Sequence, residues 1–367
     1  MNTIRNFFCD ITEPRDSNKR HTLLDIITIV LCAVICGADS WEDIEEFGTT
    51  KREWFETFLE LPHGIPTHDT FARVFASMDS KEFQEAFLRW VGAIQETTRN
   101  RIVAIDGKTL RRSYEKDKSP LHLVSAWACE NKMVLGQVKT KEKSNEITAI
   151  PELLRVLELE GCIVTLDAMG CQKEIVKTII DKGADYVLGL KGNQGTLHDD
   201  VELYFEDCRA SGFEDVAYDY HETIDGDHGR IETRRYWTTA DIDWLADKTL
   251  WKNLSTIAMV QRERYVDGVT SLETSYYITS LTSDAVQIAR AVRGHWGIEN
   301  SLHWVLDIAF REDESRIRKD HAPANFATIR HMALNLLRKE TTSKRSIRGK
   351  RLKAGWDTDY LERILKG

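Results

Sequence analysis

The sequence predicts an α/β fold in which a mixed β-sheet with flanking helices follows an all-helical region. Two observations support this prediction. From residue 1 to about residue 95, apolar side chains recur at the spacing of amphipathic helices. From residue 100 onward, short apolar runs typical of buried strands alternate with segments typical of helices.

The N-terminal region, residues 1–95, is expected to contain several short helices. The apolar run Ile26–Ala38 is shorter than the roughly 20 residues that cross a bilayer, so it predicts a buried helix and no membrane partner. Thr67 and Ser80 are expected to cap two further helices. These helices could form a helix-turn-helix DNA reader, or a bundle that only covers the next domain.

Composition limits the classes of protein that fit. The chain has 367 residues, enough for two or three structural units, and no signal peptide opens it. Its seven cysteines lack paired spacings, which indicates reduced thiols in a cytosolic protein. The formal net charge of −9 argues mildly against a nucleic-acid partner, yet residues 338–353 hold eight Lys or Arg against Glu340. That basic run is either a solvated segment or a phosphate-binding one.

Two carboxylates follow predicted buried strands. Asp106 comes directly after the apolar run Ile102–Ile105, and Asp167 comes after Ile163–Leu166. An unpaired carboxylate beside a core strand is costly, so a bound cation is the expected partner. If the two strands lie side by side, both acids meet at one edge of the sheet.

The order of the predicted elements matches a ribonuclease H-like sheet. The Asp106 strand is followed by strand-like runs at 121–131 and 132–140, and then by a helix with Pro151 near its start. The Asp167 strand, a helix over 172–182 and a strand over Tyr186–Leu190 complete the order. The first and fourth strands are then expected to be parallel neighbours.

A β-rich insertion is expected at about residues 212–282, with Asp267-Gly268 as a hairpin turn. Its Arg230, Arg234 and Arg235 either grip nucleic acid or lie on a solvated sheet edge.

Glu299 has a histidine four residues to each side, His295 and His303, within a predicted helix. Three interpretations stay open. The three side chains form a hydrogen-bonded polar face, or they form a zinc-type site. Alternatively, Glu299 joins Asp106 and Asp167, and three carboxylates without cysteine suit Mg²⁺ or Mn²⁺.

Five motifs carry a family resemblance: AIDGKTLRRSY, EKSNEITAIPELL, TLDAMGCQKEI, DYVLGLKGNQGTL and RGHWGIENSLHWVLD. With them, the chain from about Asp10 to its C-terminus resembles the H-repeat-associated proteins, which are insertion-sequence transposases of the DDE type. The resemblance implies a ribonuclease H-like catalytic domain at residues 96–337, interrupted by the insertion. It also implies an associated helical domain at 1–95 and leaves a basic C-terminal segment at 338–367.

By this resemblance, Asp106, Asp167 and Glu299 are the catalytic residues and ligate Mg²⁺, with Mn²⁺ as an alternative. One departure stands out. Where the wider superfamily has a Tyr and an Arg before its Glu and a Lys seven residues after it, this chain has Val292, His295 and Leu306.

The resemblance further implies DNA partners, namely element ends and target, and a homodimer or higher oligomer on that DNA in the bacterial cytoplasm. Residues expected near phosphates are Lys108, Arg111, Arg112, Lys191, Asn193, Arg293 and His295. The expected activity is cleavage at element ends and strand transfer. A metal-dependent nuclease without joining activity and a non-mobile DNA-binding relic are the alternatives.

Overall fold

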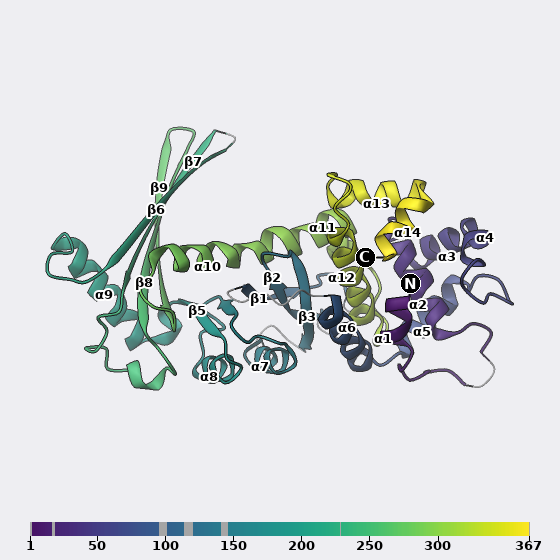
Figure 1. The fold of residues 1–367 in the computed structure, drawn as a ribbon, viewed down its shortest axis with the longest axis horizontal. Coiled ribbons are helices and arrows are strands. Elements are labelled where there is room, and N and C mark those ends of the chain that lie inside the picture. Colours follow the sequence, from purple (N-terminus) through teal and green to yellow (C-terminus); the bar gives the residue numbers. More distant parts are fainter. Residues whose placement is uncertain are drawn as a thin grey trace. The chain divides into compact units, whose positions relative to one another are not determined.

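The computed structural model describes residues 2–16, 19–94, 101–113, 120–140, 146–227 and 229–366. By its internal contacts the chain divides into two compact units (Figure 1). The first unit combines residues 1–96, 107–145 and 299–367, and the second combines 97–106 and 146–298. Each unit is therefore assembled from segments that are far apart in the sequence.

The N-terminal part of the first unit is helical, as predicted. Its helices are α1 (Asn2–Phe8), α2 (Leu23–Ile35), α3 (Trp41–Thr50), α4 (Arg52–Phe55), α5 (His68–Ser77) and α6 (Ser80–Ile94). All residues of α2 except Leu24 are buried, which confirms the buried helix predicted from the apolar run. Among the described residues, no helix is both long and apolar enough to cross a bilayer.

The two predicted helix caps are only partly right. Thr67 occupies the N-cap position of α5, but its hydroxyl lies 3.2 Å from the Thr70 hydroxyl and makes no capping bond to the backbone. Ser80 is already inside α6. The preceding Asp79 accepts hydrogen bonds from the backbone amides of Lys81 and Glu82, at 2.8 and 3.1 Å. A carboxylate in that place satisfies two amides that the helix itself leaves unpaired.

The remainder of the first unit packs around one long helix. Its elements are β2 (His122–Ala128), β3 (Met133–Thr140), α11 (Trp304–Phe310), η5 (Glu312–Glu314), α12 (Ala322–Lys339), α13 (Ile347–Trp356) and α14 (Thr358–Lys366). Helix α12 is buried from Ala322 to Leu337 and packs against α2, α6 and β3. Asn335 pairs with both backbone groups of Val134, at 2.8 and 2.9 Å, which fixes α12 to the strand.

The basic C-terminal run is partly structural. Lys350 is buried and donates to the carbonyl oxygens of Leu337 and Glu340. Arg351 is also buried and donates to the carbonyl of Val34 at 2.8 Å. Because these two cations cap the ends of packed helices, they are not available to phosphates.

The second unit contributes most of a nine-stranded sheet with the order β3-β2-β1-β4-β5-β9-β8-β7-β6. Its strands are β1 (Ile102–Thr109), β4 (Ile163–Leu166), β5 (Asp185–Leu190), β6 (Asp219–Asp227), β7 (Arg230–Thr239), β8 (Thr256–Val266) and β9 (Val269–Thr279). Strands β1, β4 and β5 are parallel to one another. The order 3-2-1-4-5 confirms the ribonuclease H-like arrangement.

The predicted β-rich insertion continues this same sheet. Strand β9 pairs antiparallel with β5, from Val187↔Thr279 to Leu190↔Tyr276, and β8, β7 and β6 follow outward. Asp267 and Gly268 have φ values of 48° and 83°, which confirms the tight hairpin turn between β8 and β9. The long outer strands β6–β9 extend past helix α10 (Ala285–Gly297) in Figure 1.

Helices cover the parallel strands. Helices α7 (Glu146–Val156) and α8 (Lys173–Asp181) pack against each other below the strands in Figure 1, and α10 runs above them. Pro151 was predicted near the start of this helix. It lies in the middle of α7, because the helix already begins at Glu146. Helix α9 (Thr196–Ala210) and strand β6 were not predicted.

The arginines of the insertion are paired with acids. Arg234 is buried, with its guanidinium 2.5 Å from both Asp225 and Glu232. Arg235 lies 2.8 Å from Glu222 and 2.9 Å from Glu263. Arg230 also contacts Glu232, at 2.8 Å. The pairs Arg234–Asp225, Arg235–Glu222 and Arg235–Glu263 join neighbouring strands and stabilise the ribbon.

Candidate active site

The register of the parallel strands aligns two of the predicted acids. In the β1–β4 pair, Ile102 lies opposite Ile163 and Ala104 opposite Thr165. Two residues further along each chain, the same register reaches Asp106 and Asp167. Asp106 and Asp167 therefore each follow the aligned pair Ala104↔Thr165 by two residues, Asp106 within β1 and Asp167 just after β4. Strand β1 continues past Asp106 to Thr109, so the predicted strand end at the acid is wrong, whereas β4 does end just before Asp167.

Asp167 is held in place by backbone amides. Its Oδ1 accepts hydrogen bonds from Met169 at 3.0 Å and Gly170 at 3.1 Å. The following segment is tied down as well, because the Asn193 side chain donates to the carbonyl of Ala168 at 2.8 Å. Asp167 itself is exposed, and its second carboxylate oxygen is turned toward no hydrogen-bond donor of the described residues.

A glycine keeps the space beside Asp167 open. A Cβ added to Gly189 on β5 would lie 3.3 Å from the backbone nitrogen of Ala168 and 3.8 Å from the Cα of Asp167. Any side chain at this position would therefore crowd the segment that carries the acid. The sequence interpretation did not single out Gly189, since a lone glycine in a strand is a weak signal.

Helix α10 leads the chain over the same strands. The imidazole Nδ1 of His295 lies 3.1 Å from the hydroxyl of Thr165 on β4. One residue earlier, a Cβ at Gly294 would lie 3.0 Å from two side-chain carbons of Ile102 on β1. The helix thus approaches the strands that precede both aspartates, and α10 ends at Gly297, two residues before Glu299.

Glu299 lies in a π-helical turn, Ile298–His303, that connects α10 to α11. Its carboxylate is exposed and lies 3.0 Å from Nδ1 of His303, which is buried. The hydrogen bond from His303 holds the pKa of Glu299 below its ordinary value of 4.5. The carboxylate is therefore ionised and oriented, as a metal ligand requires. π-turns of this kind are frequent at functional sites.

Lys108, predicted to lie near phosphates, is contacted by two acids of the first unit. Its ammonium lies 2.5 Å from Asp307 and 3.1 Å from Glu312, and it donates to the carbonyl of His303 at 3.3 Å. Burial disfavours the charged amine, but the ion pairs with Glu312 and Asp307 outweigh burial and raise the pKa of Lys108. Glu312 is itself buried and also faces Arg330 at 3.5 Å.

The other predicted phosphate contacts have different environments. Arg111, Arg112, Lys191 and Arg293 have exposed side chains, whereas His295 is half-buried against Thr165. Arg111 lies 3.2 Å from Asp313, and Arg293 lies 3.7 Å from Asp225. Exposed pairs of this kind are weak, so both arginines can exchange their carboxylate for a phosphate.

The donor set beside the strand ends suits a hard divalent cation. Asp167 offers one anchored carboxylate with a second oxygen turned outward, and Gly189 leaves room next to it. Asp106 adds a second carboxylate on the neighbouring strand, two residues past the pair Ala104↔Thr165. Oxygen ligands without cysteine are typical of Mg²⁺ and Mn²⁺ sites.

The fold defines an α/β protein with a ribonuclease H-like sheet, in which Asp106 lies on β1 and Asp167 follows the neighbouring strand β4. Comparison with protein families then gives the particular family. Residues 97–336 match the family model described as "Transposase DDE domain", and residues 5–91 match the model "DDE_Tnp_1-associated". The chain belongs to the DDE-domain transposase family.

Two curated relatives from Escherichia coli, matched over nearly their full length, agree with this assignment. The "Putative transposase YncI" of Escherichia coli O157:H7 is 42% identical over 100% of this chain and 95% of its own length. The "H repeat-associated putative transposase YhhI" of Escherichia coli K12 is 40% identical over 95% of this chain and 93% of its own. A solved piggyBac transposase synaptic complex with hairpin DNA is 11% identical, with a TM-score of 0.42, over 100% of this chain and 78% of its own.

Proposed function

We propose that this member of the family is an active DNA transposase, which cleaves DNA at the ends of an element and transfers the freed strands into target DNA. The observation that supports it most is the parallel β1–β4 pairing, whose aligned pair Ala104↔Thr165 lies two residues before Asp106 and Asp167. The substrates are element termini and target DNA, and we expect a homodimer or higher oligomer on that DNA in the bacterial cytoplasm.

We propose that Asp106, Asp167 and Glu299 together hold divalent cations, Mg²⁺ or Mn²⁺, at the scissile phosphate. Ions bound there supply Lewis-acid activation of a nucleophile and stabilise the leaving oxygen of an in-line displacement. Asp106 would be the ligand common to the ions, and Asp167 and Glu299 would each contribute a further carboxylate. Glu299 is included because it follows His295 by only four residues, and His295 at the end of α10 contacts Thr165 on β4.

The protein's residues then have distinct tasks. The backbone amides of Met169 and Gly170 fix the Asp167 carboxylate before substrate binds, and His303 fixes Glu299. A group held in this way loses little entropy when the ligand arrives. In the proposed reaction, water attacks first and frees a 3′-hydroxyl at the element's end. That hydroxyl then attacks the target DNA. Each nucleophile approaches in line with the leaving oxygen.

Exposed cations are proposed to follow the DNA backbone near these acids: Arg111, Arg112, Lys191 and Arg293. His295 is proposed as an additional phosphate contact. Lys108 and Asn193 are proposed to act indirectly, because Lys108 is engaged by Asp307 and Glu312 and Asn193 by the Ala168 carbonyl.

The test incubates the purified chain and Mg²⁺ with linear DNA that carries candidate element ends, and measures both cut and joined products. Asp106→Ala, Asp167→Ala and Glu299→Ala should each abolish cutting and joining and leave DNA binding in EDTA intact. A matched control is Asp199→Ala, which removes an exposed carboxylate of α9. Full activity in any of the three variants would remove that residue from the site.

The same assay separates the alternatives. Cut DNA without joined products identifies a metal-dependent nuclease. Binding in EDTA without any cutting by the wild type identifies a DNA-binding relic. Only joined products that require Mg²⁺ support the transposase.

A further inference from the structure

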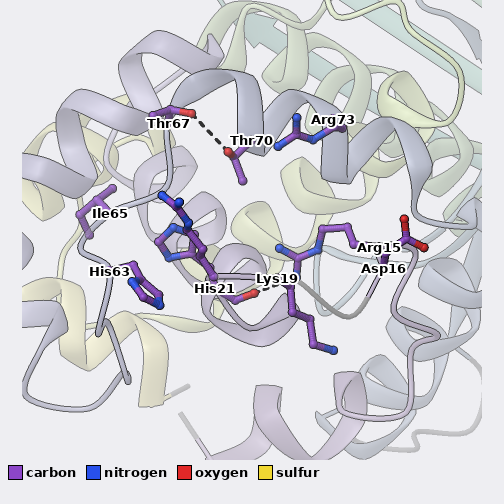
Figure 2. Close-up of a pocket in the computed structure, with 10 residues that line it drawn as sticks. Arg15, Asp16, Lys19, His21, His63, Ile65, Thr67, Thr70 and Arg73 are labelled. Carbon is purple, nitrogen blue, oxygen red and sulfur yellow. Dashed lines mark hydrogen bonds between the residues drawn. The ribbon is translucent and has the colours of Figure 1, made fainter.

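A basic cleft lies in the N-terminal helical part of the first unit and is lined from the segments 15–16, 19–21, 63–67 and 70–73 (Figure 2). Its volume is about 530 Å³. The residues around it are Arg15, Asp16, Lys19, Arg20, His21, His63, Ile65, Thr67, Thr70 and Arg73. Four cations against the single carboxylate of Asp16 leave a formal charge of +3 in a chain whose net charge is −9.

The cations of the cleft differ in how they are engaged. Arg15 pairs with Glu13 through two bonds, at 2.7 and 2.8 Å, and donates to the carbonyl of His21 at 2.8 Å, which fixes the loop. Lys19 lies 3.5 Å from the same glutamate. Arg20 and Arg73 are exposed, and no carboxylate of the described residues lies within ion-pair distance of either guanidinium. These two arginines have their charge available for an external anion.

Neutral donors line the same cleft. The hydroxyls of Thr67 and Thr70, joined by a dashed line in Figure 2, lie 3.2 Å apart at the first turn of α5. The rings of His21 and His63 stand edge to face, with centroids 6.3 Å apart. Burial, and then the charges of His63, Arg15 and Arg20, lower the pKa of His21, so this imidazole is a neutral hydrogen-bonding group. Its buried Nδ1 has no hydrogen-bond partner among the described residues.

We infer that this cleft binds a phosphate of the DNA backbone, with Arg20 and Arg73 as its ionic contacts and the threonine hydroxyls as donors. Arginine with nearby hydroxyls and a helix N-terminus is a combination that matches phosphate oxygens. The inference rests on the proposed function for its choice of DNA. It places a DNA contact in the associated domain, apart from the three acids, and makes no use of a helix-turn-helix motif.

The test measures binding of the full chain to a fluorescent DNA duplex in EDTA, where no metal-dependent step takes place. Arg20→Ala and Arg73→Ala should each weaken affinity by about tenfold or more, since each removes a charged hydrogen bond. The double variant should also reduce the slope of log affinity against log salt by about 2. Arg73→Lys should retain part of the affinity. The control Arg89→Ala removes an exposed arginine of α6 outside the cleft and should bind as wild type does.

A second arm separates DNA from free phosphate compounds. If the cleft instead serves a free anion, inorganic phosphate or a nucleoside triphosphate will raise the melting temperature of the wild type but not of the double variant, and DNA affinity will be unchanged in the variant. That result overturns the assignment to DNA. Wild-type affinity in the Arg20/Arg73 double variant, with unchanged folding by circular dichroism, also overturns it. Neither result bears on Mg²⁺-dependent joining by the wild type, so failure of the cleft and failure of the proposed function are distinguishable.

Discussion

At the scale of single residues, the side chains that orient the acids are as informative as the acids. His303 is buried and holds Glu299, and the backbone after Asp167 holds that carboxylate. The sequence placed His303 beside Glu299 from their spacing alone, since residues four apart share a helix face. It left the role of the pair open, because a polar face, a zinc-type site and a magnesium ligand all fit that spacing.

Removing His303 should weaken the metal site through Glu299. His303→Ala is expected to raise the Mg²⁺ concentration for half-maximal cleavage by roughly 10- to 100-fold, as loss of an orienting partner does. The wild-type carboxylate has a depressed pKa and stays ionised below pH 4.5, so the variant should lose cleavage at a higher pH as acid is added. Cleavage rates measured against Mg²⁺ and against pH test both expectations.

A matched control for this variant is His68→Ala, which breaks a similar pair with Glu45, at 2.6 Å on the exposed surface. His303→Gln, which keeps a hydrogen-bond donor, should recover part of the metal affinity. If His303→Ala leaves both profiles unchanged, His303 has only a packing role.

Lys108 shows why some side-chain partners could not be predicted. A lysine two residues after an acid, followed by two arginines, is typical of a phosphate-binding stretch. The partner of Lys108, Asp307, lies 199 residues later in the sequence. The sequence around Lys108 gives no sign that the helix of Asp307 packs beside it. Only the folded chain brings such partners together.

At the scale of elements, the predictable strands were those with apolar runs. Strands β1, β4 and β5 are buried and were found, as were the paired runs of β2 and β3. Strand β6, DYHETIDGD, has few apolar residues. It contacts its neighbour β7 through ion pairs such as Arg235–Glu222 and not through a hydrophobic face. A periodicity of hydrophobic residues cannot detect a strand of this kind.

The contact between α10 and β1 should be sensitive to a single methyl group. Gly294→Ala places a Cβ 3.0 Å from the Ile102 side chain, so the helix must shift or the isoleucine must move. Overpacking of this kind costs about 1–3 kcal/mol. Because the same helix leads to Glu299, cleavage should fall by at least about tenfold for a shift near 1 Å. Urea unfolding and single-turnover cleavage measure the two effects.

Gly92→Ala is the control for that variant. Gly92 also lies in a helix, α6, but a Cβ there meets nothing within 4 Å, so stability should increase by up to about 1 kcal/mol. Adding Ile102→Val to Gly294→Ala should restore cleavage, since it removes one of the crowding carbons. Wild-type cleavage by Gly294→Ala alone would mean that α10 does not position Glu299.

At the scale of the whole molecule, the chain passes from one unit to the other beside two of the three acids. Asp106 is the last residue of a second-unit segment, and Glu299 is the first residue of a first-unit segment. A cation held by the proposed triad would be bound only by the folded chain. Binding energy that only the native state gains adds to stability.

Manganese should accordingly protect the whole chain against thermal unfolding. At about 100 times its dissociation constant the ion should add roughly 2.7 kcal/mol to the free energy of unfolding. Asp106→Asn should lose this protection, and in EDTA it should be at least as stable as the wild type, because clustered carboxylates repel one another. Calorimetry of both proteins with and without Mn²⁺ tests this. Equal protection of the variant would place the ion elsewhere.

The pairing of β9 with β5 gives residues 212–282 a second role besides anything they do on DNA. They were predicted as an insertion, which implies a segment that could be deleted from the chain. Excision would leave the backbone amides and carbonyls along one side of β5 bare from Val187 to Leu190, on a strand whose sequence is almost entirely apolar. Such a rim recruits strands from other molecules. A shortened chain should thus precipitate even with all three acids present, and homologues that lack this segment must shield the rim by another element.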